Sequence, residues 1–122
     1  MESILTSIKK MLGIEEDYTH FDVDIIMHIN SALSILTQLG VGSQEGFSIH
    51  DETALWADFA LTDSKLDSIK SYTYMKVKLF FDPPQSSAVI ESINRSISEL
   101  EWRIQVAAES TVNKSKGEIL NV

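Results

Sequence analysis

The sequence contains no cysteine among its 122 residues, which excludes both a disulfide framework and a thiolate metal site. This absence fits a protein made in a reducing cytoplasm. Proline and glycine are scarce, with two and five residues, so long regular elements can form. No apolar run approaches the roughly 18 residues that a membrane-spanning helix needs. The N-terminus lacks the leading positive charges of a signal peptide, so we expect neither an export signal nor a membrane partner.

Basic residues are missing from a long part of the chain. No lysine or arginine occurs from Met11 to Ser64, and the net charge of the whole sequence is −8. The acidic residues of this stretch are Glu15, Glu16, Asp17, Asp22, Asp24, Glu45, Asp51, Glu52, Asp58 and Asp63. Between Lys65 and Arg103 the two signs nearly balance, so the charge is unevenly distributed along the chain. A conventional nucleic-acid-binding protein carries a basic face that releases counterions from phosphates, so the charge argues against that class.

Apolar residues at helical spacing predict an all-α fold, a small multi-helix bundle with a long C-terminal helix. Hydrophobic residues make up 43% of the chain and charged residues 23%, as in ordinary globular proteins. The first helix is expected over residues 3–12, where one face is apolar, and Gly13 is placed to stop it.

A second, central helix is predicted to begin near Thr19. Thr19 and Asp22 match a capping box, and Tyr18 and Val23 are spaced as a hydrophobic staple. Apolar residues follow at spacings of three and four, and Gly40 lies where a C-terminal glycine would end the helix.

The segment 41–63 is less regular. The alternation of apolar and polar residues over 47–50 leaves room for a short β-hairpin within 41–52. Asp51 is placed to cap a short helix that carries Leu55, Trp56 and Phe59.

The run 65–81 fits two structures. Residues 75–79 alternate between apolar side chains and lysine, as in a strand. The run also follows helical spacing through Leu66, Ile69, Thr73, Val77 and Phe80. A capping box of Ser64 and Asp67, together with the length of the run, favours a helix.

The break Asp82-Pro83-Pro84 ends that helix, because a residue before proline avoids the α region. Asp82 is expected to cap the last helix, with the first proline in its first turn. This helix carries a heptad-like seam of Ile90, Ile93, Ile97, Leu100, Ile104 and Ala107. After Ala108 the chain turns polar. We therefore expect a single domain over 1–108 and a flexible polar tail over 109–122.

No pattern of catalytic or ligand-binding residues stands out. The segment 40–46 is glycine-rich like a phosphate loop, but it lacks the Walker lysine and follows a predicted helix rather than a strand. Asp24 and His28 share a helix face, yet no further metal ligand is evident, so a surface pair is the simpler interpretation. No nucleophile elbow occurs. We therefore predict a protein that is not an enzyme, with no catalytic residue, no metal and no cofactor.

The two tryptophans are candidates for contacts with other proteins, because tryptophan is enriched at interface hot spots. Trp102 lies off the main seam of the last helix and forms a second apolar ridge with Val106, one turn later. Trp56 fits packing in the core or at its rim as well as an interface role.

The order of these elements resembles the small head–tail connector (adaptor) proteins of long-tailed phages and prophages. The resemblance covers 1–108 and rests on the loop with Trp56 and on four segments, namely Met11-Leu12-Gly13-Ile14, Gln38-Leu39-Gly40-Val41-Gly42, Phe80-Phe81-Asp82-Pro83-Pro84 and Glu99-Leu100-Glu101-Trp102-Arg103. The Asp-Pro-Pro break between two helices is the most telling of them.

The resemblance implies a structural virion protein without catalysis. Rings of about twelve subunits would dock on the portal protein and extend the DNA exit channel toward the tail. They would meet a downstream head-closure (stopper) protein, and they would contact DNA only as it passes. Such a protein is made in the bacterial host cytoplasm and ends at the head–tail interface of the virion.

The charge pattern is compatible with such a ring. The acidic first half of one subunit would face Lys70, Lys76 or Lys78 of its neighbour and steer the contact between them. An acidic channel wall would let DNA slide, since it offers no gain from counterion release.

Two other functions stay open at this point. A small acidic intracellular inhibitor that imitates DNA would share the charge, but it needs carboxylates arrayed along an exposed face. Here many acids lie at expected caps and loops, namely Asp22, Asp51, Asp67 and Asp82. A generic helical interaction module would instead use the seam of the last helix to bind a partner helix. It predicts a monomer or dimer rather than a ring.

Overall fold

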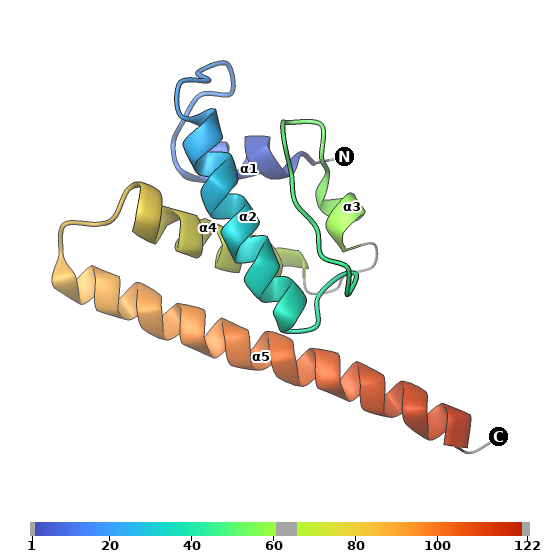
Figure 1. Ribbon diagram of the computed structural model, residues 1–122. Helices are drawn as coiled ribbons and strands as arrows, with labels where there is room; N and C mark the ends of the chain where they lie inside the picture. The colour runs from blue at the N-terminus through green and yellow to red at the C-terminus, as the bar shows by residue number, and fades with distance from the viewer. Residues whose placement is uncertain (1, 61–65, 121–122) are drawn as a thin grey trace.

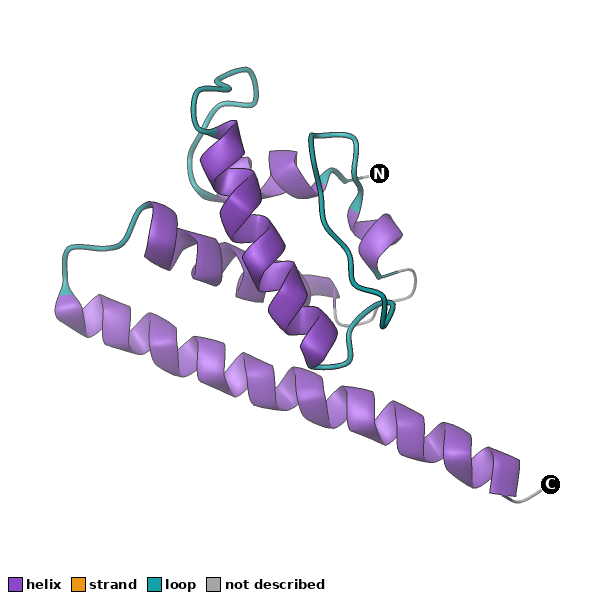
Figure 2. Ribbon diagram, in the orientation of Figure 1, coloured by secondary structure: helices purple, strands orange, loops and turns teal. Residues whose placement is uncertain are grey.

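The computed structural model describes residues 2–60 and 66–120, with side chains as far as Ser110. Within these residues the chain is all-α, as the sequence predicts, and no strand is present beyond a single isolated bridge between Ser3 and Leu55 (Figure 2). The helices are α1 (Ile4–Met11), α2 (Asp22–Gln38), α3 (Trp56–Phe59), α4 (Leu66–Phe81) and α5 (Ser87–Leu120). None of the helices in the described part is long and apolar enough to cross a membrane.

Helix α2 is the central element, as predicted. It crosses α4, α1 lies beside its N-terminal half, and α5 runs beneath α4 and extends past the rest of the molecule (Figure 1). Its buried residues are Ile25, Ile29, Ala32, Leu33 and Leu36. The facing residues of α4 are Ile69, Tyr72, Thr73 and Val77. Each large apolar side chain buried here stabilises the fold by about 1.5–3 kcal/mol, so the α2–α4 contact is the main source of stability.

The start of α2 differs from the prediction. The helix begins at Asp22, no side chain caps it, and the expected capping box at Thr19 is absent. The Asp22 carboxylate instead pairs with Lys9 of α1. The predicted hydrophobic staple is also wrong, because Val23 is 80% exposed. The Asp22 carboxylate, which the local pattern predicted to cap α2, is therefore used in an ion pair with another helix.

The segment 41–52 is a loop without a hairpin. The Asn30 side chain of α2 binds the backbone of Ile49 through both groups: its Nδ2 donates to the Ile49 carbonyl oxygen at 3.0 Å, and its Oδ1 accepts from the Ile49 N–H at 2.7 Å. These are the groups that a strand partner would need. The side chain of Ile49 is buried in the core, so the loop is fixed against α2.

The short helix α3 forms where it was expected, but Asp51 does not cap it. The Asp51 carboxylate accepts hydrogen bonds from the N–H and hydroxyl groups of Thr53, which close a local turn. The side chain of Asp58 accepts from the Leu55 N–H at 2.8 Å and so satisfies the start of α3.

The run that fitted both strand and helix is the helix α4. Of its predicted capping box, Ser64 lies outside the described residues. Phe80 continues the helical spacing but is 67% exposed, so the buried face of α4 ends at Val77.

The break at Asp82-Pro83-Pro84 is confirmed, but the last helix begins four residues later than predicted, at Ser87. The Asp82 N–H donates to the Lys78 carbonyl oxygen at 3.0 Å, so Asp82 still belongs to the end of α4. Ser86 is the residue that caps α5, since its hydroxyl lies 3.4 Å from the Val89 N–H.

The predicted seam of α5 faces the body. Ile97 and Ile104 are buried, and Ile90, Ile93, Leu100 and Ala107 are half-buried. The helix continues past Ala108 to Leu120, into the segment 109–122 for which a tail was expected.

Tyr72 joins α4 to α5 through a partly buried hydrogen bond. Its hydroxyl donates to Glu101 Oε2 at 2.7 Å, and the residue is fully buried. Burial, reinforced by this bond, raises the pKa of Tyr72 above its ordinary value of 10.0. The contribution to stability is therefore complete below pH 10 and is lost as the pH rises above it, because the unfolded chain can then ionise.

We expect Tyr72→Phe to lower the free energy of unfolding by about 1.5–3 kcal/mol at neutral pH, because a charged acceptor loses its buried donor. Urea unfolding followed by circular dichroism measures the change. In strongly alkaline solution the difference between the two proteins should shrink, since only the wild type carries the Tyr72 hydroxyl. If the difference in the free energy of unfolding stayed constant up to alkaline pH, the raised pKa of Tyr72 would be contradicted.

Candidate interaction surfaces

The outer face of α5 carries the apolar ridge that the sequence singled out. Trp102 is 65% exposed and Val106 is 39% exposed, while the opposite face of the helix packs on the body. Arg95 lies two helical turns before Trp102 and therefore on the same face. Arg103 pairs with Glu99 one turn before it. We call Arg95, Glu99, Trp102 and Val106 the outer ridge of α5.

Trp56 does not belong to any surface. It is 1% exposed, and its indole Nε1 donates to the Ser7 hydroxyl oxygen of α1 at 2.8 Å. The side chain joins α3 to α1 inside the core, which is the packing role that the sequence also allowed for Trp56.

The three lysines of α4 have separate local partners. Lys70 pairs with the Glu2 carboxylate, and Lys78 pairs with Asp82 at 2.7 Å. The ammonium of Lys76 lies 5.9 Å from the centre of the Phe80 ring, in a cation–π contact. Intrachain pairing partly neutralises two of these charges, which leaves Lys76 as the lysine best placed for a neighbouring molecule.

A group of aromatic side chains at the C-terminal end of α4 was not predicted from the sequence. Phe21 contacts Tyr18, His20 and Phe81 with ring centres 4.8–5.9 Å apart, and the His28 ring stacks on Phe80 at 5.9 Å. We call these residues the aromatic edge: Tyr18, His20, Phe21, His28, Phe80 and Phe81. Phe80 is 67% exposed and Tyr18 49% exposed, so the edge is open to solvent. The sequence signal was the paired phenylalanines just before the Asp-Pro-Pro break.

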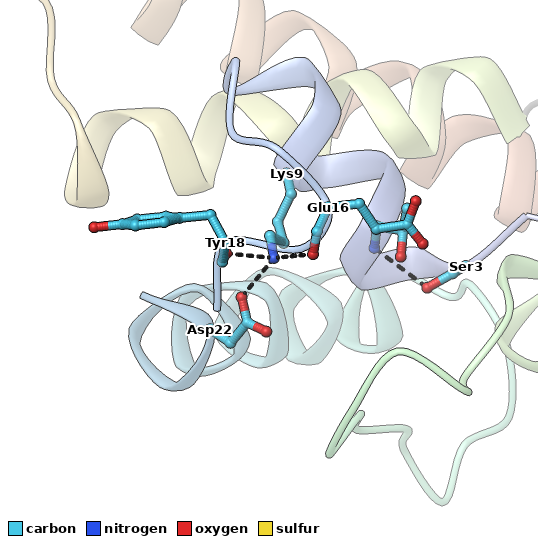
Figure 3. Close-up of polar contacts among 6 residues, drawn as sticks. Ser3, Lys9, Glu16, Tyr18 and Asp22 are labelled. Atoms are coloured by element: carbon cyan, nitrogen blue, oxygen red, sulfur yellow. Dashed lines mark hydrogen bonds and ion pairs between the residues drawn. The ribbon is translucent and has the colours of Figure 1, made fainter. Parts of the chain in front are cut away.

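Lys9 holds the loop that carries part of this edge (Figure 3). Its ammonium donates to the carbonyl oxygens of Glu16 at 2.9 Å and Tyr18 at 2.7 Å, and it pairs with Asp22 Oδ1 at 2.9 Å. The Tyr18 ring points away from the ammonium. The lysine is only 2% exposed, so all three donor positions are used within the protein. Lys9 thus fixes the α1–α2 loop and leaves its aromatic side chains outward.

Neither a metal site nor a catalytic constellation emerges from these contacts. Asp24 and His28 form no metal cluster, because the described residues hold no group of three or more possible His, Asp or Glu ligands. The His28 ring is engaged with Phe80 instead. The outer ridge of α5 and the aromatic edge expose apolar and aromatic side chains, which suits contacts with other proteins.

Comparison with known proteins identifies the family. The model of the phage connector protein family matches residues 4–111, which is most of the chain. The chain therefore belongs to the phage connector proteins, a family of structural virion components, and the resemblance seen in the sequence is confirmed. No curated protein and no solved structure gave a match.

Proposed function

We propose that this protein is the head–tail connector of its phage and forms a ring beneath the portal that extends the DNA exit channel toward the tail. Membership of the connector family supports the connector role. The observation that carries the ring is the outer ridge of α5, where an exposed tryptophan lies on a helix that extends past the body (Figure 1). A monomer gains nothing from exposing Trp102, whereas a repeating contact between subunits would bury it.

The partners follow from this position in the virion. The portal protein lies above the ring, a head-closure protein lies below it, and DNA passes through without being bound. The net charge of −8 supports the last point, since an acidic wall offers no counterion release to a phosphate backbone. We propose that the protein is made in the bacterial host cytoplasm before it assembles at the head–tail interface.

The structure weighs against the other two functions. A partner-helix module needs a free seam on α5, but Ile97 and Ile104 are already buried within the subunit. A DNA mimic needs free carboxylates in a row, but three of the acids are engaged within the subunit: Asp22 pairs with Lys9, Asp58 caps α3 and Asp82 pairs with Lys78.

Native mass spectrometry of the protein, alone and with the portal protein of its phage, tests the proposal. We expect a closed ring of about twelve subunits, either alone or only on the portal. A protein that stays monomeric or dimeric and leaves the portal unchanged would contradict the ring.

Ring formation should also depend on salt. If acidic and basic surfaces steer neighbouring subunits together, raising the salt concentration to about 0.5 M shortens the screening length to a few ångströms and slows association. Stopped-flow light scattering at low and high salt measures the rate. An unchanged rate would remove the support for electrostatic steering.

A further inference from the structure

We infer that the outer ridge of α5 docks on the aromatic edge of a second copy of this chain, in a head-to-tail contact. The inference rests on the proposed ring and specifies which two surfaces make it. Both surfaces belong to every subunit, so one contact repeated around an axis uses each of them once.

The two surfaces cannot meet within one subunit. The aromatic edge lies where α4 ends, close to the start of α5, whereas Trp102 is 15 residues beyond Ser87. At 1.5 Å per residue, Trp102 lies about 22 Å along the helix axis from that end. It also points away from the body, with 65% of its surface exposed. Only another copy can bring the tryptophan to the aromatic side chains.

The edge carries charges of both signs, and its acids complement the ridge. Lys76 lies over the Phe80 ring, 5.9 Å from its centre, and two carboxylates belong to the α1–α2 loop and the first turn of α2. Asp17 and Asp24 flank the aromatic edge, and both are exposed. Among the described residues, neither carboxylate has a cationic partner, and Arg95 on the outer ridge has no carboxylate partner. Docking of the ridge on the edge would place this arginine near the two acids. An arginine can also stack on exposed rings, which the edge supplies.

The outer ridge and the aromatic edge also both expose apolar, largely aromatic side chains. The edge offers the exposed face of Phe80 and the ring of Tyr18, and the ridge offers Trp102 with Val106 beside it. Aromatic rings pair favourably in offset or edge-to-face arrangements. A contact between two copies of the ridge would instead bring like charges of Arg95 together without using the aromatic edge. The head-to-tail arrangement buries both exposed apolar surfaces.

Cross-linking between introduced cysteines tests the contact directly, because the natural chain has none. One variant carries Ser98→Cys, one turn before Trp102 on α5, and the other carries Thr19→Cys, between Tyr18 and His20. Both positions are exposed, and Trp102 and Phe80 stay in place. The two variants are mixed with a short bismaleimide, on the portal protein if the free subunits do not assemble. We expect a covalent dimer from the mixture and none from either variant alone. A chain carrying both changes should give a ladder of covalent oligomers.

The matched control pairs Ser98→Cys with Glu45→Cys, since Glu45 is exposed on a loop far from the edge in sequence. A 98–98 product, or a 98–19 yield no higher than the 98–45 yield while rings form, would overturn this contact and leave the ring intact. If no ring forms with or without the portal and no cross-link appears, the proposed function fails together with the inference.

A second pair of variants tests the energetics. Trp102→Glu and Phe80→Glu change exposed positions, so each should keep the helical circular dichroism spectrum of the wild type. Each should weaken subunit association by about 30-fold or more, as loss of an interface hot spot does. Mixed together, they retain one intact contact per pair and should form heterodimers that do not extend to rings. Rings from either variant alone at wild-type concentrations would refute the contact.

Discussion

Replacement of Lys9 by methionine should lower the free energy of unfolding by about 3–5 kcal/mol, because removal of one partner leaves the other charge of a buried ion pair uncompensated. The change removes the donor for two backbone carbonyls and the countercharge of Asp22. Asp22 Oδ1 is buried and has no hydrogen-bond partner besides this ion pair. Methionine keeps much of the side-chain volume, so the loss reports the charge and the hydrogen bonds rather than a cavity.

Lys10→Met is the matched control, because the neighbouring lysine is exposed on the same helix. It should change the free energy of unfolding by less than about 0.5 kcal/mol. Urea unfolding of both variants measures the difference. Equal stabilities of the two variants would show that the buried contacts of Lys9 do not stabilise the α1–α2 loop.

Lys9→Met should also weaken ring formation, since the same loop positions Tyr18 and Phe21.

Gly40→Ala should destabilise the protein by about 2–4 kcal/mol, through backbone strain and overpacking together. Gly40 has φ of +101°, a conformation that residues with a Cβ atom rarely adopt. A Cβ atom there would lie 2.7 Å from the Cβ atom of Ala108, so it would push α5 away from the end of α2.

Gly13→Ala separates the two causes. Gly13 has φ of +80°, but an added Cβ atom would meet nothing within 4 Å. That variant should lose only the backbone part, about 1–2 kcal/mol. Adding Ala108→Gly to Gly40→Ala should recover part of the loss in thermal unfolding, because it removes the clash. Equal losses for Gly13→Ala and Gly40→Ala, without recovery, would show that α5 does not lie against Gly40.

The fold was predictable where periodicity and local sequence agree. The helical spacing of α2 and α5, the buried seam around Ile97 and the break at Asp82 were all evident, because these features depend on residues close in sequence. The helix in 66–81 was harder, since an alternating segment lies within it. Packing of Ile69 and Val77 on α2 resolves it in favour of helix.

Three of the wrong or open predictions share one cause, which is contact between residues distant in sequence. The acid expected to cap α2 pairs with Lys9, and the side chain of Asn30 occupies the backbone that a hairpin would have used. The core position of Trp56 depends on Ser7, 49 residues away. The aromatic edge was not predicted either, because Phe80 follows the helical spacing of buried residues, although its ring stacks on His28 at the surface and is 67% exposed.

The most direct test of the ring is electron microscopy of the portal protein incubated with this protein. We expect a second closed ring, coaxial with the portal, with an open channel through both. The outer ridge of α5 should lie at each boundary between neighbouring subunits, against the aromatic edge. Portal particles without added density, or single subunits bound at the periphery without mutual contact, would contradict it.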